Sequence, residues 1–369
     1  MPGAKLLLIS LCLHTLSPCN KMHMRYLKYL FLSSIILTTS CNRNFSRLSK
    51  EENKYNLTIA SELKDRVYSQ KIEDFYDSGK EGIFAGKSDV QIHYRIFEQI
   101  DTEKAILISS GRTEAAIKYK ELIFDLFNNG YSIDIHDHRG QGLSGRMTED
   151  LEMGYIDTFQ FYVDDMKFFY DHYLKPKHYS KTYLLAHSMG GAIGMTHLEQ
   201  NPDDFNAAAF SSPMLGFKPP ICSIVKVLDG DKPKYAIGET EYKDSKITFE
   251  GNTLTGSELR YDRMIDAFAE VPEAKLGGAT YQWIHKSCQQ FDYIFSNIHK
   301  INTPFILFSA ENEQIVHPYA HQKFVDAAQK SSKDCIAYAV ENAQHELFIE
   351  KDEQRIETIN EVLDFYSKY

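Results

Sequence analysis

The chain has 369 residues, the size of one large domain or of one domain that carries an insertion. Hydrophobic residues make up 43% and charged residues 25%, which is ordinary for a globular protein. The formal net charge of -10, without a basic stripe interleaved with aromatic residues, argues against nucleic-acid binding. The sequence has no internal repeat, no low-complexity tract and no glycine-rich phosphate loop. Its many tyrosines and phenylalanines, 23 of each, suit a large core and an apolar substrate surface.

The first part of the chain, residues 1–41, differs from the rest and is typical of a secretory signal. Residues 24–29 are basic, residues 30–37 are apolar, and small residues lead to Cys41. The apolar run is shorter than the ~20 residues of a membrane-spanning helix. A cysteine after small residues resembles a bacterial lipobox, although Leu37 lies one position too far from it. We expect a lipoprotein anchored through Cys41 and facing the periplasm or exterior; a signal cleaved without lipid and an uncleaved anchor are the alternatives.

The cysteines give no sign of a disulfide framework. With the signal removed and Cys41 lipidated, three widely spaced cysteines are left: Cys222, Cys288 and Cys335. An odd number without CxxC or metal-ligand spacing predicts buried or isolated thiols.

The first half of the chain alternates between strand and helix patterns. Residues 42–75 are polar and predict a tether followed by a helix. Period-two alternation then predicts a β-hairpin, short apolar runs predict buried strands, and a 3.6-residue period that ends at Gly130 predicts a helix. The predicted elements are the hairpin strands at residues 82–84 and 90–96, strands at residues 105–110 and 131–135, and a helix at residues 119–129.

The same alternation continues in the second half. The predicted elements are helices at residues 159–174 and 320–329, and strands at residues 183–185, 205–210, 305–308 and 336–340. Strands that alternate with helices predict an α/β fold with a mainly parallel sheet and helices on both faces.

One polar segment, residues 213–298, interrupts the alternation and contains the only tryptophan, Trp283. An insertion between two strands of the sheet would form a mostly helical lid over the carboxyl edge, where open α/β folds bind ligands. We therefore predict a two-part core, residues 76–212 and 299–369, with the lid inserted between the parts.

The most informative motif surrounds Ser188. An apolar strand precedes it, a glycine-rich helix start follows it, and the positions two before and two after it are Ala186 and Gly190. A serine on such a tight strand-to-helix turn is typical of a nucleophile elbow. Chance matches to this short pattern are common, so the other members of a catalytic triad have to support it.

An acid and a histidine follow in the order that α/β-hydrolases require, serine, acid and then histidine. Glu313 comes after the strand at residues 305–308, and His345 comes after the strand at residues 336–340. We predict that His345 is the general base and Glu313 the acid, with Glu311 as the alternative acid. The alternative for His345 is an ordinary histidine of a surface loop, without a catalytic role.

The oxyanion of an acyl-transfer reaction needs two preorganised N–H donors. We predict the backbone N–H groups of Met189, directly after the serine, and of Arg112, in the loop after the strand at residues 105–110. An ordinary turn residue is the alternative for Arg112. The glycine-rich loop at residues 137–146 is interpreted as scaffolding beside the site, with Asp137 able to pair with Arg139.

Together these motifs resemble bacterial membrane-associated lysophospholipases of the monoacylglycerol lipase and serine aminopeptidase-like branch of the α/β-hydrolases. The resemblance rests on residues 110–114, 118–130, 137–146, the elbow, residues 344–346 and, within the expected lid, residues 277–283. It implies an α/β-hydrolase fold, a triad of Ser188, Glu313 and His345, and an oxyanion hole of Met189 and Arg112. It departs from the common pattern at Ala186 and in using a glutamate as the acid.

The expected activity is that of a serine carboxylester hydrolase that releases fatty acid from lysophospholipids at a membrane surface. No cofactor, no metal and no obligate protein partner is implied. A monoacylglycerol lipase or general esterase is the nearest alternative. A serine aminopeptidase would need a carboxylate for the substrate amine, such as Glu258 or Asp262. A non-catalytic surface lipoprotein is the alternative from another class.

Overall fold

The computed structural model describes residues 45–48, 52–243, 248–331 and 333–369. The predicted signal and Cys41, the predicted site of lipidation, lie outside the described residues. Within the described ranges, no helix is both long enough and apolar enough to cross a bilayer.

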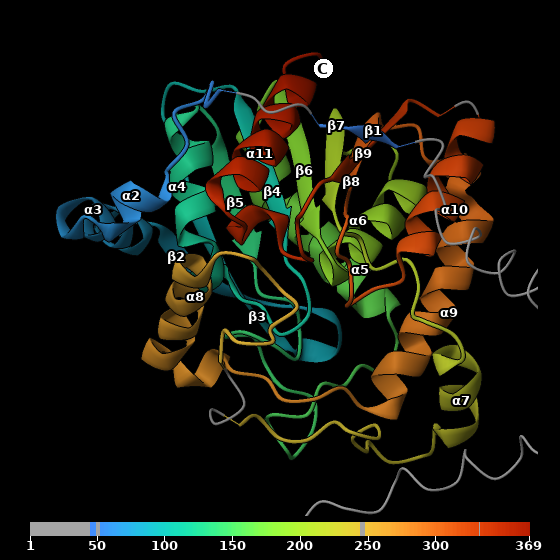
Figure 1. Cartoon of the computed structure of the whole chain (residues 1–369). Helices are drawn as coiled ribbons and strands as arrows, with labels where there is room; N and C mark the ends of the chain where they lie inside the picture. The colour runs from blue at the N-terminus through green and yellow to red at the C-terminus, as the bar shows by residue number, and fades with distance from the viewer. Residues whose placement is uncertain (1–44, 49–51, 244–247, 332) are drawn as a thin grey trace, which may run out of the picture. The chain divides into compact units, whose positions relative to one another are not determined.

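A nine-stranded mixed sheet forms the centre of the fold (Figure 1). Its strands are β1 (Ser46–Arg47), β2 (Lys80–Ala85), β3 (Gln91–Phe97), β4 (Lys104–Ser109), β5 (Ser132–His136), β6 (Lys181–His187), β7 (Ala207–Ser211), β8 (Phe305–Ala310) and β9 (Cys335–Val340). They lie in the order β1-β9-β8-β7-β6-β4-β5-β3-β2. The β2–β3 hairpin and the β3–β5 pair are antiparallel, and the other neighbours are parallel. The predicted hairpin and mainly parallel sheet are confirmed.

Helices cover both faces of the sheet, as predicted (Figure 1). They are α2 (Ala60–Lys64), α3 (Arg66–Asp77), α4 (Lys120–Asn128), α5 (Gln160–Phe169), α6 (Met189–Gln200), α7 (Ile221–Leu228), α8 (Glu258–Glu270), α9 (Tyr281–Asn297), α10 (Pro318–Lys330) and α11 (Asp352–Tyr366). α4 and α11 pack on one face, and α5, α6 and α10 pack on the other.

Strand β6 shows why the central strands are apolar throughout. Tyr183 and Leu185 point into the core under α4 and α11, while Leu184 and Ala186 point into the core under α5 and α6. Successive side chains of a strand point to opposite faces, and both faces of this sheet are covered by helices. Burial of Leu184 and of Leu185 contributes about 1.5–3 kcal/mol each, so the apolar run that predicts this strand also fixes it at the centre of the sheet.

The structure differs from the predicted elements in four places, one of which is the C-terminal helix α11, which was not predicted. β1 was not predicted; its two residues pair in parallel with β9 at the sheet edge. The predicted helix at residues 159–174 is α-helical only to Phe169 and continues as a π-helical turn over Tyr170–Leu174. The strand predicted from residue 205 begins at Ala207, because Asn206 uses its backbone and side chain to bond to the start of β6.

The segment between β7 and β8, residues 212–304, carries α7, α8 and α9. α7 and α9 are joined by a disulfide between Cys222 and Cys288, so the prediction of isolated thiols is wrong for these two. The two cysteines are separated by 66 positions in sequence and gave no local sign of the pairing, which follows from the packing of α7 against α9. Cys335 is a free, half-buried thiol.

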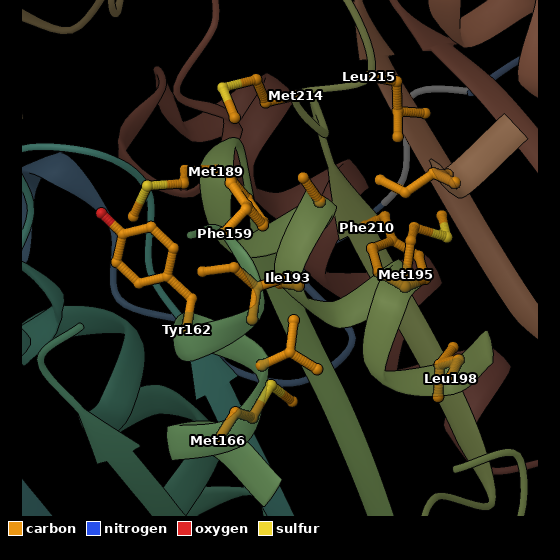
Figure 2. Close-up of a cluster of buried hydrophobic side chains, with 14 of the residues drawn as sticks. Phe159, Tyr162, Met166, Met189, Ile193, Met195, Leu198, Phe210, Met214 and Leu215 are labelled. Atoms are coloured by element: carbon orange, nitrogen blue, oxygen red, sulfur yellow. The ribbon is translucent and has the colours of Figure 1, made fainter. Parts of the chain in front are cut away.

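A cluster of buried apolar side chains anchors the first turn of α6 (Figure 2). Met189, the first residue of that helix, is fully buried and lies in this cluster with Phe159 and Tyr162 of the α5 region. The Tyr162 hydroxyl accepts a hydrogen bond of 3.2 Å from the Trp283 indole N–H. The core therefore connects the helix start to the segment between β7 and β8.

Candidate active site

Ser188 lies on the sharp turn between β6 and α6. Its backbone has φ 49° and ψ -117°, a positive-φ conformation that costs a non-glycine residue about 1–3 kcal/mol and persists only where the surroundings fix it. A Cβ on Gly190 would lie 2.1 Å from the carbonyl oxygen of Ser109 at the end of β4. The glycine therefore lets α6 approach β4 closely, and Ala186, fully buried, fits at the other small position.

The structure brings the three predicted triad residues into one hydrogen-bonded line. Ser188 Oγ lies 2.9 Å from His345 Nε2, and His345 Nδ1 lies 2.7 Å from Glu313 Oε2. All three side chains are buried. Since an ionised carboxylate can only accept, Nδ1 carries the imidazole proton and Nε2 is left to accept the serine proton. This arrangement can activate a serine for nucleophilic attack; the catalytic roles stay predictions until activity is measured.

The Glu313 carboxylate is fixed and ionised. Its Oε1 accepts the backbone N–H groups of Ile315 and Val316, at 2.8 and 3.1 Å. Burial raises the pKa of this carboxyl, but its hydrogen bond to His345 and the attraction of that ring when it is protonated lower the pKa to about 2. The alternative acid, Glu311, is exposed and accepts the backbone N–H of Asn342 instead. The geometry therefore favours Glu313 as the partner of the histidine.

Both predicted oxyanion donors are open. Met189 is the first residue of α6, so its N–H has no intrahelical acceptor. In the described ranges, no hydrogen bond uses the Met189 or Arg112 N–H. The oxyanion loop, residues 110–114, is held by Gln141, whose Nε2 donates to the Gly111 and Glu114 carbonyls at 2.7 and 2.9 Å. Its Oε1 accepts the Thr113 N–H at 3.3 Å.

The loop at residues 137–146 has a scaffolding geometry, but one predicted contact is wrong. Arg139 does not pair with Asp137; its guanidinium forms two hydrogen bonds, of 2.6 and 2.7 Å, to the carboxylate of Asp165 on α5. Asp137 instead accepts the backbone N–H groups of Ala116 and Leu143. Asp137 and Arg139, which flank His138 in the sequence, therefore contact different elements of the fold.

Sequence reasoning missed a buried charge cluster that borders the triad. Lys118 forms ion pairs with Glu114 and with Glu346, the latter at 2.6 Å. His187 Nε2 lies 3.1 Å from Glu346, and its ring packs against that of His345, with 4.8 Å between centroids. Burial raises the pKa of Glu346, but the charges of His187 and Lys118 lower it well below its usual value. The only local signal was that Glu346 directly follows the predicted base.

This cluster has the donor set of a metal site, since ligand atoms of Glu114, His187 and Glu346 lie within 4.8 Å of one another. The Lys118 ammonium, however, already contacts both carboxylates. A second cation there would meet repulsion from the ammonium, so we interpret the cluster as an ion-pair network.

A cavity of 510 Å³ opens onto the triad, a volume within the ~300–1,000 Å³ range of small-molecule sites. Ser188 and His345 lie in its wall, and its other lining is mostly apolar side chains from the segment between β7 and β8. These include Phe217, Ile221, Leu254, Tyr261, Phe268, Leu276 and Trp283. Such a wall suits a long apolar group held beside a reactive serine.

The family model described as serine aminopeptidase, S33, matches residues 100–352, which contain all the site residues above. The chain belongs to the serine aminopeptidase S33 family. Among curated relatives, lysophospholipase L2 of Escherichia coli K12 is 32% identical over 309 residues, covering 81% of this chain and 90% of that protein. Mouse (Mus musculus) monoglyceride lipase is 31% identical over 135 residues, covering 36% of this chain and 43% of that protein.

Solved structures agree on the fold of this S33-family chain. A soluble variant of monoglyceride lipase from Saccharomyces cerevisiae, in complex with a substrate analog, superposes with a TM-score of 0.63 at 20% identity. The match covers 79% of this chain and 94% of that one. The predicted α/β-hydrolase fold is confirmed.

Proposed function

We propose that this protein is a serine carboxylester hydrolase that releases fatty acid from lysophospholipids. The observation that carries the proposal is the line Ser188–His345–Glu313 at the wall of an apolar cavity. The name of the bacterial relative that aligns with most of the chain supports the substrate class.

The geometry accounts for each step of ester cleavage. Ser188 Oγ attacks the acyl carbonyl carbon while His345 Nε2 takes its proton, and Glu313 stabilises the imidazolium. The tetrahedral oxyanion accepts hydrogen bonds from the Met189 and Arg112 N–H groups. The intermediate collapses when His345 returns the proton to the leaving glycerol oxygen. Water activated by His345 then attacks the acyl-enzyme, which frees the fatty acid and restores the serine.

Two alternatives share this chemistry. A monoacylglycerol substrate is supported by the partial match to a monoglyceride lipase and by the same apolar cavity. A peptidase is less supported, because Glu258 and Asp262, the carboxylates predicted to hold a substrate amine, are exposed and do not line the cavity.

We also propose that residues 213–298 act as a lid and that the enzyme works at a membrane surface through a lipidated Cys41. Four apolar side chains of α7 support the membrane location, because they are partly or largely exposed: Ile221, Ile224, Val227 and Leu228. If the anchor exists, Cys41→Ala moves the protein from the membrane fraction to the soluble fraction, and mass spectrometry of the wild-type N-terminal peptide finds a lipid on the cysteine. An unmodified Cys41 would reject the anchor.

The test of activity measures product release by the purified full chain from lysophosphatidylethanolamine, monoacylglycerol and an aminoacyl-arylamide. We expect preference for the lysophospholipid, and its loss in Ser188→Ala. Ser287→Ala is the matched control, since Ser287 is also a buried serine, on α9 and away from the triad. Preference for another substrate would overturn the substrate class, and activity that survives Ser188→Ala would overturn the mechanism.

A further inference from the structure

Arg112 differs from the buried arginines of this fold because it has no carboxylate partner. Its side chain lines the cavity beside Ser188, yet it forms no ion pair in the part of the chain that the structure describes. A cation withdrawn from water without a counter-ion is costly, so buried charges are normally paired. The three fully buried arginines show the usual arrangement: Arg139 pairs with Asp165, Arg260 with Glu121, and Arg355 with Asp125.

The guanidinium is nevertheless held in one place. Nη2 donates to the Gly277 carbonyl at 2.9 Å, and the group lies 5.0 Å from the centre of the Trp283 ring. A Cβ on Gly154 would lie 2.4 Å from Nη2, so the glycine leaves the space that the guanidinium fills. Nε is buried without a partner, and Nη1 has no bond among the described residues. The charge is therefore positioned by neutral groups at the cavity wall.

The charge of Glu239 acts on Arg112, but the two side chains form no ion pair in the described residues. Burial lowers the pKa of this guanidinium, and the charge of Glu239 opposes that effect. The Glu239 carboxylate, however, accepts the backbone N–H of Ala279 at 3.2 Å and is not paired with Arg112. The cavity thus presents an open cationic group a few bonds from the predicted oxyanion donor of the same residue.

We propose that the Arg112 side chain binds the phosphodiester of the lysophospholipid headgroup and so selects lysophospholipid over monoacylglycerol; this inference rests on the proposed function. When the acyl carbonyl lies at Ser188, the phosphodiester is separated from it only by the glycerol carbons. The phosphodiester is a permanent anion, and a guanidinium matches its oxygens with parallel N–H donors. Monoacylglycerol carries a neutral hydroxyl at that position and gains nothing from the charge.

The test compares kcat/KM for 1-palmitoyl lysophosphatidylethanolamine and 1-palmitoylglycerol, which share the acyl chain. We expect Arg112→Gln to lower the ratio of the two values by about ten- to a hundredfold, as the loss of a charged hydrogen bond does. Arg112→Lys keeps the charge without the planar donors and should give an intermediate ratio. A displaced backbone N–H of residue 112 would lower kcat/KM for both substrates, and this shared effect cancels in the ratio.

Arg146→Gln is the matched control. Arg146 also lacks a carboxylate partner in the described residues, but its guanidinium donates to backbone carbonyls and it does not line the cavity. The ratio of the two kcat/KM values for Arg146→Gln should equal that of the wild type. An unchanged ratio in Arg112→Gln would overturn the inference while leaving the proposed function standing. A wild type that does not hydrolyse the lysophospholipid would contradict the proposed function itself.

A second measurement needs no variant. Glycerophosphoethanolamine, the headgroup without its acyl chain, should inhibit wild-type hydrolysis of monoacylglycerol more strongly than glycerol does. Equal inhibition by the two would overturn the inference. The carboxylate of the fatty-acid product is the other anion that Arg112 could bind. In that case Arg112→Gln weakens inhibition by palmitate and leaves the ratio of the two kcat/KM values unchanged. That result would also overturn the inference.

Discussion

Gln141 offers the sharpest prediction, because its side chain makes three hydrogen bonds to the loop that carries one oxyanion donor. We expect Gln141→Met, which keeps the size of the side chain and removes all three bonds, to lower kcat with little change in KM. The Arg112 N–H must point at the developing oxyanion, and the loop around it includes Thr113 at φ 63°, a strained conformation that needs outside support. Without that support the donor is no longer preorganised.

The expected magnitude follows from the number and kind of bonds. Three hydrogen bonds at a net of about 0.5–1.5 kcal/mol each give a loss of about 1.5–4.5 kcal/mol in the free energy of unfolding. Complete removal of an oxyanion donor costs about 10²–10³ in kcat. A donor that is displaced rather than deleted should cost less, so we expect kcat to fall about ten- to a hundredfold.

Gln282 provides a closely matched control. Its side chain also bonds to a loop, donating to the carbonyls of Gly230 and Lys232 at 2.8 Å and accepting the Lys234 N–H at 3.3 Å. Gln282→Met should lower stability by a similar amount in urea unfolding but leave kcat for a chromogenic acyl ester near the wild-type value. The reasoning is refuted if both variants lose kcat equally, or if Gln141→Met stays within about twofold of the wild type.

Three further predictions concern stability. Gly190→Ala would place a Cβ 2.1 Å from a backbone oxygen, so we expect thermal denaturation to show a large loss of stability, whereas Gly230→Ala, with open space around the new Cβ, should show none. The Glu313 pKa is lowered from 4.5 to about 2, which corresponds to about 3 kcal/mol of folding stability. This stability is fully present above pH 4.5 and is lost as the pH falls toward 2. In urea unfolding, the free energy of unfolding of Glu313→Gln should therefore fall less over that pH range than that of the wild type. Replacing Cys222 and Cys288 by serine removes a cross-link between positions 66 apart in sequence and should lower the free energy of unfolding by about 2–4 kcal/mol. A reductant that leaves the wild-type Tm unchanged would contradict this.

The sequence alone determined the features that depend on neighbours along the chain. The apolar runs of β4, β6 and β8 predict buried strands because a strand covered by helices on both faces is mostly apolar. The small residues around Ser188 predict the elbow because a side chain at Gly190 would collide with β4. The order of serine, acid and histidine is the one that α/β-hydrolases use. Parallel strands end at the same sheet edge, which is why Glu313 and His345 could be placed on loops there.

The tertiary structure alone decided the contacts between residues far apart in sequence. The pairing of Cys222 with Cys288, of Arg139 with Asp165, and the docking of β1 beside β9 left no local pattern. Each depends on which helix or strand packs against which, and many pairings of the same residue types are compatible with one sequence.

The features of the active site also divide into those that the sequence determined and those that only the tertiary structure decided. Arg112 was identified for its backbone N–H, because the position after a strand fixes where the main chain points. Its unpaired guanidinium, the support from Gln141 and the ion pairs of Lys118 became visible only with the fold. Electrostatic pairing and burial depend on distances in space, and a linear sequence does not contain those distances until the core has brought its elements together.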